Sequence, residues 1–323
     1  MELIVGQVGR CLGTGGVSRG AQNAGFKVAR AVDKDPTAWE TYAANFPKAK
    51  LHRMPIDEFI QRADESSYSR IDVLHLSPPC QYFSPAHTRP SQSDEQNIDA
   101  LTCCSALINN LRPRLVTVEQ TFGLTFRRHR EYLNSLIGDL TSFGFSVRWK
   151  VVDLRLWGSV QSRKRLIIIA AGPGERLPLF PSATHSNNNN LHDGLIPYTT
   201  IRKALEKIQH GDELHDLSST KRFHPRRTPL SFDAQVGTIC TGGNDFYYPD
   251  GSREYTLREY ACLQGFPISH VFRGTKGTVK RHIGNAFPPN TVKILYKHLE
   301  RCLLRQDRVA AYQPLRTETM TIE

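Results

Sequence analysis

The sequence lacks the features that would mark an exported or membrane-bound protein. No apolar run approaches the roughly 20 residues that span a bilayer, and residues 1–13 lack the charged-then-apolar order of a signal peptide. The seven cysteines are an odd number and none stands in a C-x-x-C pair, which argues against a disulfide framework and against a zinc ribbon. We therefore expect reduced thiols in a cytosolic or nuclear compartment.

Acidic residues are few beside the basic ones. The 323 residues include 42 Lys and Arg but 31 Asp and Glu, which gives a net charge of +11 and a pI of about 9.4. Such an excess attracts polyanions, and nucleic acid is the commonest of these inside a cell. With 39% hydrophobic and 23% charged residues, the composition is that of a globular chain of one large domain or two modest ones.

The first 170 residues alternate short β-branched runs with amphipathic stretches, which is typical of an α/β fold. Strands are expected at 3–8, 27–32, 71–76, 115–118, 146–152 and 166–170, and helices at 17–24, 36–45, 97–111 and 129–143. Residues 173–255 show little periodicity, with one short helix expected at 200–208 and a turn at 248–251, before helical spacing returns at 292–304. We predict an α/β domain of residues 1–172 plus 276–323, interrupted by a smaller domain of residues 173–275.

A glycine-rich turn separates the first expected strand from the first expected helix. Gly13, Gly15 and Gly16 let a ligand approach the backbone, and the helix N-terminus offers free N–H groups. Asp33 ends the next strand, where an acidic side chain commonly binds ribose hydroxyls. The turn is not G-x-G-x-x-G, which weakens the case for a dinucleotide, and an ordinary tight turn with a surface aspartate is the alternative.

Two further side chains follow expected strands. Cys80 comes after Pro78 and Pro79, which stiffen the backbone behind the strand at 71–76, and Glu119 comes after the strand at 115–118. Ligands of open α/β sheets bind at such carboxyl strand ends. Taken singly, a half-buried structural cysteine and a solvated glutamate would also explain them.

The motifs stand in a distinctive order along the chain. They are the glycine turn, Asp33, Pro79-Cys80-Gln81, Glu119, Gln161-x-Arg163-x-Arg165, Arg258-Glu259 before Gln264-Gly265-Phe266-Pro267, and Gly284-Asn285-Ala286-Phe287-Pro288-Pro289. In this order the chain resembles the cytosine-C5 DNA methyltransferase family over nearly its whole length. Glu119-Gln120-Thr121, where most of the family has Glu-Asn-Val, resembles the fungal branch linked to repeat-induced silencing.

The resemblance implies a Rossmann-like S-adenosylmethionine-dependent methyltransferase sheet with a smaller, irregular target-recognition domain. It implies DNA as partner, S-adenosyl-L-methionine as cofactor, no metal, no membrane and a location in the nucleus. In the implied mechanism Cys80 adds to C6 of a cytosine that is flipped out of the duplex, and Glu119 holds N3 and the exocyclic amine. Arg165 contacts the base O2 or a phosphate, and Arg163 supports it.

The resemblance also assigns binding residues. Those implied for the cofactor are Cys11, Gly13, Gly15, Gly16, Asp33, Lys34, Pro79, Asn285 and Ala286. Those implied for DNA are Gln81, Ser84, Lys221, Arg222, Arg226, Arg227, Thr238, Gly242, Gly243 and Arg258.

One departure from the family pattern keeps alternatives open. Gly9-Arg10-Cys11 replaces the usual Asp-Leu-Phe, so that no aromatic ring stacks on the adenine and weak cofactor binding is expected. A catalytically silent DNA-binding silencing factor is therefore one alternative. A tRNA cytosine-C5 methyltransferase is another, although the Cys-Phe-Thr element of that branch is missing. A nicotinamide oxidoreductase would explain neither Cys80 nor residues 284–289.

Overall fold

The computed structural model describes residues 1–6, 14–62, 71–85, 87, 89–92, 94–187, 194–241 and 246–312. Cys11, Gly13, Gly242 and Gly243, to which the sequence assigns binding roles, lie outside the described residues, as do Gly9 and Arg10. In the described part of the chain, no helix combines the length and the apolar character needed to cross a membrane.

A seven-stranded sheet with the order β3-β2-β1-β4-β5-β7-β6 forms the larger lobe. Its strands are β1 (Glu2–Gly6), β2 (Lys27–Val32), β3 (Lys50–His52), β4 (Val73–Leu76), β5 (Leu115–Thr121), β6 (Ser146–Asp153) and β7 (Lys164–Ala171). All neighbouring pairs are parallel except those made by β7, which runs antiparallel to β5 and β6. The strand order reverses between β1 and β4, and ligands of open α/β sheets bind at such a reversal.

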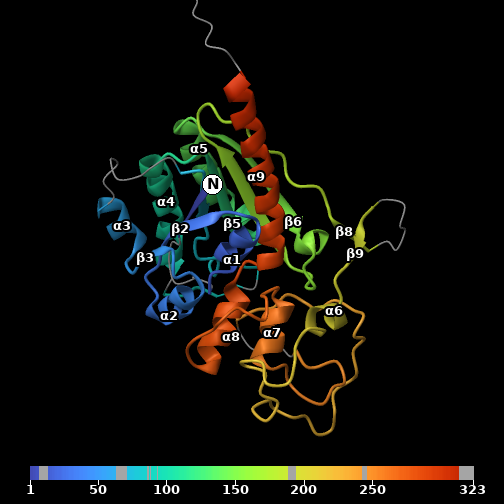
Figure 1. Ribbon diagram of the computed structural model, residues 1–323. Coiled ribbons are helices and arrows are strands. Elements are labelled where there is room, and N and C mark those ends of the chain that lie inside the picture. The colour runs from blue at the N-terminus through green and yellow to red at the C-terminus, as the bar shows by residue number, and fades with distance from the viewer. Residues whose placement is uncertain are drawn as a thin grey trace, which may run out of the picture.

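Helices cover both faces of this sheet, as Figure 1 shows. One core joins the sheet to α1 (Gly16–Asn23) and α9 (Pro289–Tyr312). A second core joins the other face to α3 (Ile56–Arg62), α4 (Asp94–Leu111) and α5 (Arg130–Ser142). Every residue of β4 and β5 is buried, which is expected of central strands with helices on both sides. The fold is therefore the Rossmann-like methyltransferase fold that the sequence predicted.

The remaining elements of the larger lobe are short. Helix α2 (Pro36–Asn45) begins as predicted, with the Asp35 carboxylate accepting a hydrogen bond from the Thr37 backbone N–H at 3.0 Å. In the described residues, the 3-10 turns η2 (Phe122–Thr125) and η4 (Leu154–Trp157) follow β5 and β6, and η3 (Arg127–His129) follows η2. Strand β3 and helix α3 were not predicted, because three and seven residues carry too little periodicity to be recognised.

A smaller, irregular lobe lies beyond one end of the sheet (Figure 1). It contains the parallel pair β8 (His185–Ser186) and β9 (Ile196–Pro197), and the helices α6 (Ile201–Leu205), α7 (Leu257–Leu263) and α8 (Lys276–Asn285). Its core includes Tyr260 of α7 and both Val279 and Ile283 of α8. The predicted domain division stays a prediction, and this core extends across its boundary at 276.

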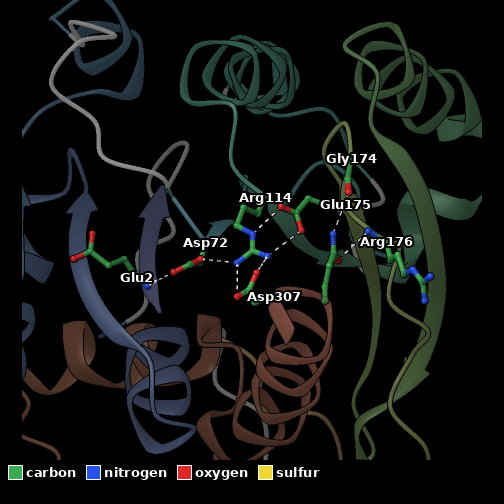
Figure 2. Close-up of polar contacts among 8 residues, drawn as sticks. Glu2, Asp72, Arg114, Gly174, Glu175, Arg176 and Asp307 are labelled. Atoms are coloured by element: carbon green, nitrogen blue, oxygen red, sulfur yellow. Dashed lines mark hydrogen bonds and ion pairs between the residues drawn. The ribbon is translucent and has the colours of Figure 1, made fainter. Parts of the chain in front are cut away.

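A buried arginine ties the end of α9 to the sheet. Arg114, 6% exposed, contacts Asp72 (Nη1–Oδ1 3.1 Å), Glu175 (Nε–Oε1 2.7 Å) and Asp307 of α9 (Nη1–Oδ2 3.2 Å). Figure 2 shows the three carboxylates converging on the guanidinium. Asp72 also accepts a hydrogen bond from the backbone N–H of Glu2 at 2.8 Å, so β1 belongs to the same network.

Replacing Arg114 with methionine should destabilise the protein by about 3–5 kcal/mol, because three clustered carboxylates lose their only shared cation among the described residues. Urea unfolding measures the loss. Arg62→Met is the control, because Arg62 forms an exposed (i, i+4) ion pair with Glu58, and such pairs contribute about 0–1 kcal/mol. Equal losses in the two variants would contradict this role of Arg114.

Candidate active site

Cys80 lies just beyond β4, at the carboxyl edge of the sheet. The segment that carries it is held by Gln120 of β5, whose side-chain amide donates hydrogen bonds to the carbonyls of Pro78 (3.2 Å) and Pro79 (3.1 Å). Gln120 itself is fully buried, and Cys80 is half-buried. The thiol therefore sits on a backbone that the neighbouring strand fixes, as a nucleophile requires. Pro79 acts here through its carbonyl group, and its cofactor contact stays a prediction.

A carboxylate and a guanidinium meet beside this segment. Glu119 Oε1 and Arg165 Nε are 2.6 Å apart, and each side chain is 11% exposed. The antiparallel pairing of β5 with β7 brings them together, since Glu119 faces Ile167 and Thr121 faces Arg165 in the register. Glu119 was expected after the strand at 115–118, but β5 continues through it to Thr121.

Arg163 is fully buried and takes a different place from the one expected. Its guanidinium donates to the carbonyls of Ile239 (2.8 Å) and Gly284 (3.2 Å), so it ties the entry of β7 to the smaller lobe, and its support of Arg165 stays a prediction. Burial, followed by the positive charge of Arg165, lowers the pKa of Arg163 to about 9. Negative charge on Glu119 and Cys80 acts in the opposite direction. These side chains therefore share one electrostatic environment, in which Arg163 is a positioning residue.

The segment 236–241 of the smaller lobe runs beside this cluster. The Thr238 hydroxyl donates to the carbonyl of Ser162 at 2.7 Å, and the backbone N–H of Ile239 donates to Gln161 Oε1 at 3.0 Å. A Cβ added at Gly284 would lie 2.9 Å from the carbonyl carbon of Cys240, so this approach requires glycine. The segment proposed to recognise DNA is thus fixed against residues 161–163, at the entry of the strand that carries Arg165.

Two buried glutamine side chains continue the hydrogen-bond network from Gln161 to the residues that follow α8. Gln161 Nε2 donates to Gln264 Oε1 at 2.5 Å, and Gln264 Nε2 donates to the carbonyl of Ala286 at 2.6 Å. Gln161 and Gln264 are both fully buried. The two glutamines that mark separate sequence motifs therefore form one structural link between the strand entry of β7 and the end of α8.

His75 is a site residue that the sequence reasoning missed. It lies in β4 and hydrogen-bonds through Nδ1 to the Thr117 hydroxyl and through Nε2 to the Ser77 hydroxyl, both at 2.8 Å. Thr117 in turn contacts the Tyr296 hydroxyl of α9 at 2.9 Å. Burial lowers the pKa of His75 to about 3, so the ring is neutral at pH 7. The available signal was a single histidine in an apolar strand just ahead of Cys80.

A second group of residues meets across the strand-order reversal and fits a nucleoside cofactor. Gly15 precedes α1 with φ +80°, and a Cβ there would lie 2.3 Å from the Phe46 ring. The start of α1 packs on the step after α8, because a Cβ at Gly16 would lie 2.5 Å from the carbonyl of Phe287. Ala286 of that step is buried and Asn285 half-buried, while Lys34 is exposed.

Asp33 tests whether these residues fit a nucleoside cofactor. It directly follows β2 and is fully buried, with Oδ1 accepting a hydrogen bond from the Asp35 backbone N–H, yet Oδ2 has no partner among the described residues. A buried carboxylate oxygen without a partner is costly unless a ligand donates to it. A ribose hydroxyl is such a donor, so the residues present fit S-adenosyl-L-methionine.

Burial, reinforced by the charge of Asp35, raises the pKa of Asp33 to about 8 from 3.8. The folded state therefore holds a proton that the unfolded state loses. We expect the contribution of Asp33 to the free energy of unfolding to fall as pH rises from about 4 to about 8. Urea unfolding across this range should show a steeper fall for the unaltered protein than for Asp33→Asn. Asp99→Asn, at an exposed position of α4, is the control. Parallel curves for the unaltered protein and Asp33→Asn would refute the assignment.

Some of the residues expected to bind DNA are exposed, and others are partly covered by neighbouring side chains. Lys221, Arg222 and Arg226 are exposed, whereas the Arg227 guanidinium lies over the rings of Phe223 (4.4 Å) and Tyr247 (5.3 Å). Gln81 is exposed and Ser84 half-buried, in the turn that follows Cys80.

Arg258 does not have the position that a DNA contact needs. It is 1% exposed and donates to the carbonyls of Glu213 (2.9 Å) and His270 (3.1 Å). The prediction of a DNA contact is wrong here, because main-chain carbonyls inside the smaller lobe occupy the guanidinium. In the described residues there is no cluster of three or more His, Cys, Asp or Glu side chains that could hold a metal ion.

The sequence matches the family model of C-5 cytosine-specific DNA methylases over residues 11–228 and 183–301. The chain belongs to this family. Type II methyltransferase M.XorII of Xanthomonas oryzae is 30% identical over 341 residues, covering 86% of this chain and 80% of that protein. Type II methyltransferase M.Sau96I of Staphylococcus aureus is 27% identical over 320 residues, covering 89% and 74%. The protein is therefore a DNA cytosine-5-methyltransferase, with S-adenosyl-L-methionine as methyl donor.

Solved structures share the fold of this DNA cytosine-5-methyltransferase. A prophage-encoded E. coli protein, described as a DNA modification methyltransferase, has a TM-score of 0.71 at 20% identity and covers 94% of this chain and 100% of its own. The Dnmt2 methyltransferase of S. pombe has a TM-score of 0.65 at 18% identity and covers 93% and 99%. At these identities the likeness concerns the fold alone.

Proposed function

We propose that this enzyme methylates C5 of a DNA cytosine through a covalent bond between Cys80 and C6 of a flipped-out base. The observation that carries the proposal is the placement of Cys80 beside the Glu119–Arg165 pair at the carboxyl edge of the sheet, with the partnerless oxygen of Asp33 across the strand-order reversal. The residues that we propose as nucleophile, acid group and cofactor ligand thus share the region where an α/β sheet binds its ligands.

The residues have complementary chemical tasks. Cytosine C5 is a poor nucleophile, and addition of the Cys80 thiolate to C6 breaks the C5=C6 π bond and makes C5 enamine-like. Glu119 holds a proton at N3, which draws charge away from C5 and C6 in the ring and favours the addition. When bound, S-adenosyl-L-methionine supplies an electrophilic methyl carbon to C5. Removal of the C5 proton by a base then expels the thiolate and restores the double bond.

The position of Cys80 supports base flipping as part of this proposal. The thiol is half-buried in a loop that Gln120 pins to the sheet, so a base stacked inside a duplex cannot bring C6 to it. Extruding the base costs a few kcal/mol and needs replacement contacts. We propose that Arg165, Gln81 and Thr238 provide such contacts around the pocket.

The exposed cations of the smaller lobe should bind DNA phosphates. Replacing Lys221, Arg222 and Arg226 with alanine should reduce the slope of log affinity against log salt by about 0.9 for each lost contact. Arg227 is left in place because it stacks on two aromatic rings. Fluorescence anisotropy with duplex DNA measures the slope. Lys48→Ala/Lys50→Ala/Arg62→Ala removes the same charge from exposed positions elsewhere, and an equal change there would contradict the assignment.

The alternatives make different predictions for one experiment. Tritiated methyl transfer from S-adenosyl-L-methionine should label duplex DNA in a parallel assay of duplex DNA, single-stranded DNA and tRNA. Label on tRNA alone would favour a tRNA methyltransferase, and DNA binding without label would favour a silent factor. A fungal silencing role with a nuclear location stays a prediction from Glu119-Gln120-Thr121, and bacterial modification methyltransferases among the relatives weigh against it.

A further inference from the structure

A row of four cations runs along the outer face of α9, away from the active site. Lys293, Lys297, Arg301 and Arg305 recur every fourth residue and are all exposed. Side chains four residues apart share one face of a helix, and twelve residues at 1.5 Å each give the row a length of about 18 Å. We name these four residues the cation row.

The acidic residues of α9 do not neutralise the cation row. Asp307 is bound to Arg114 on the sheet side, and the Glu300 carboxylate lies within 3.0 Å of the Cβ position of Gly25 beside α1. In the part of the chain that the structure describes, none of the four cations forms an ion pair. The row therefore presents uncompensated positive charge, which attracts a polyanion.

Two cavities lie along the same face of α9. A cavity of about 590 Å³ lies between α9, the turn after η4 and residues 181–185, and Lys293, Lys297 and Arg301 line it. A second cavity of about 230 Å³ lies between α9 and residues 176–179, and Arg176 and Arg305 line it. Among the described residues, no Asp or Glu lines either cavity. The cation row thus borders a hollow surface rather than a smooth solvated helix face.

The wall opposite α9 is held in place before any ligand binds. Gln306 accepts a hydrogen bond from the Arg176 backbone N–H (3.0 Å) and donates to the Gly174 carbonyl (3.1 Å), a connection drawn in Figure 2. His298 donates to the Leu179 carbonyl at 2.8 Å. Burial lowers the pKa of His298, the hydrogen bond to Leu179 opposes this effect, and the charges of Arg301 and Arg305 add to it. A preformed wall spares the ordering cost that weakens binding to loose segments.

We propose that the cation row and its two cavities bind the sugar-phosphate backbone of a DNA segment outside the catalytic site. The family's activity on DNA brings this polyanion to the protein, and the proposal rests on that activity. The row begins beside the step that joins α8 to α9, next to the smaller lobe, and runs along the sheet away from it (Figure 1). A linear row of fixed cations fits a chain of phosphates, and a site of this kind positions DNA without reading its sequence.

Matched double variants test the proposal. Lys293→Gln/Lys297→Gln removes two cations from the row, and Lys48→Gln/Lys50→Gln removes two exposed lysines near β3. Affinity is measured against salt for duplexes of about 50 and roughly 15 base pairs, the shorter being about one and a half helical turns. For the longer duplex the slope of log affinity against log salt should fall by about 1.8 in the row variant, about 0.9 for each lost contact. It should be unchanged in the control variant.

The outcomes separate this proposal from the catalytic one. Methyl transfer to the shorter duplex should be unchanged in the row variant, whereas failure of the catalytic proposal would abolish transfer in the unaltered enzyme as well. Equal slope changes in the two double variants would overturn the proposal in favour of a general charge effect. Binding of inorganic pyrophosphate that the row variant loses, with the affinity for long DNA unchanged, would also overturn it and indicate a small-anion site.

Discussion

Replacing Cys80 with alanine is expected to lower methyl transfer to DNA by roughly four to six orders of magnitude, the scale seen when a covalent nucleophile is removed. Without the thiolate, C5 must attack the methyl donor as part of an intact aromatic ring. Gln120 holds the backbone ahead of Cys80 by donating to the carbonyls of Pro78 and Pro79. These two hydrogen bonds do not involve the Cys80 side chain. The fold and the DNA affinity should therefore survive.

The matched control is Cys103→Ala. Cys103 is also half-buried and lies in α4, in the core on one face of the sheet. Tritiated methyl transfer at saturating DNA should be near normal for this variant. Residual activity of Cys80→Ala within tenfold of the unaltered enzyme would remove Cys80 from the mechanism.

Glu119→Gln should slow methyl transfer by about 10²–10⁴-fold, which is the usual contribution of a positioned acid or base. The amide keeps the shape of the side chain but cannot share a proton with N3 of cytosine. It also leaves Arg165 without its carboxylate partner at 2.6 Å. Single-turnover kinetics should place the loss in the chemical step, with the affinity for duplex DNA nearly unchanged.

Glu131→Gln serves as the control for this variant, because Glu131 is an exposed residue in the first turn of α5. Its turnover should match that of the unaltered enzyme. A Glu119→Gln enzyme with normal turnover would show that the ion pair with Arg165 has only a structural purpose.

Apart from β3, the strands of the sheet were predictable because they are short β-branched runs, several of which are followed or ended by chemically distinctive residues. Lys27–Val32 and Pro36–Asn45 have the predicted bounds, the second because an N-cap and a first-position proline mark its start. Helices α7 and α8 were missed. They lie in a region of low periodicity, and their cores form only when Tyr260, Val279 and Ile283 come together from distant positions.

The positions of Cys80, Glu119 and Arg165 also follow from the sequence, since Cys80 comes shortly after one recognisable strand and Glu119 and Arg165 lie near the ends of two others. The positions of the other two arginines could not be predicted from the sequence. Arg163 and Arg258 look like exposed cations in the sequence, yet each is buried inside the fold, where its guanidinium donates to main-chain carbonyls. For Arg163 those carbonyls come from residues 76 and 121 positions away. No local pattern encodes such contacts, and the same holds for the hydrogen bonds of His75 to Thr117 and Ser77.

Covalent trapping with 5-fluorocytosine tests the central claim most directly. Fluorine at C5 blocks the proton removal that expels the thiolate, so the enzyme should remain bonded to DNA in the presence of S-adenosyl-L-methionine. Denaturing electrophoresis and mass spectrometry of the digested adduct should place the bond on the peptide that contains Cys80. An adduct on another residue, or an equal yield of adduct from Cys80→Ala, would contradict the account.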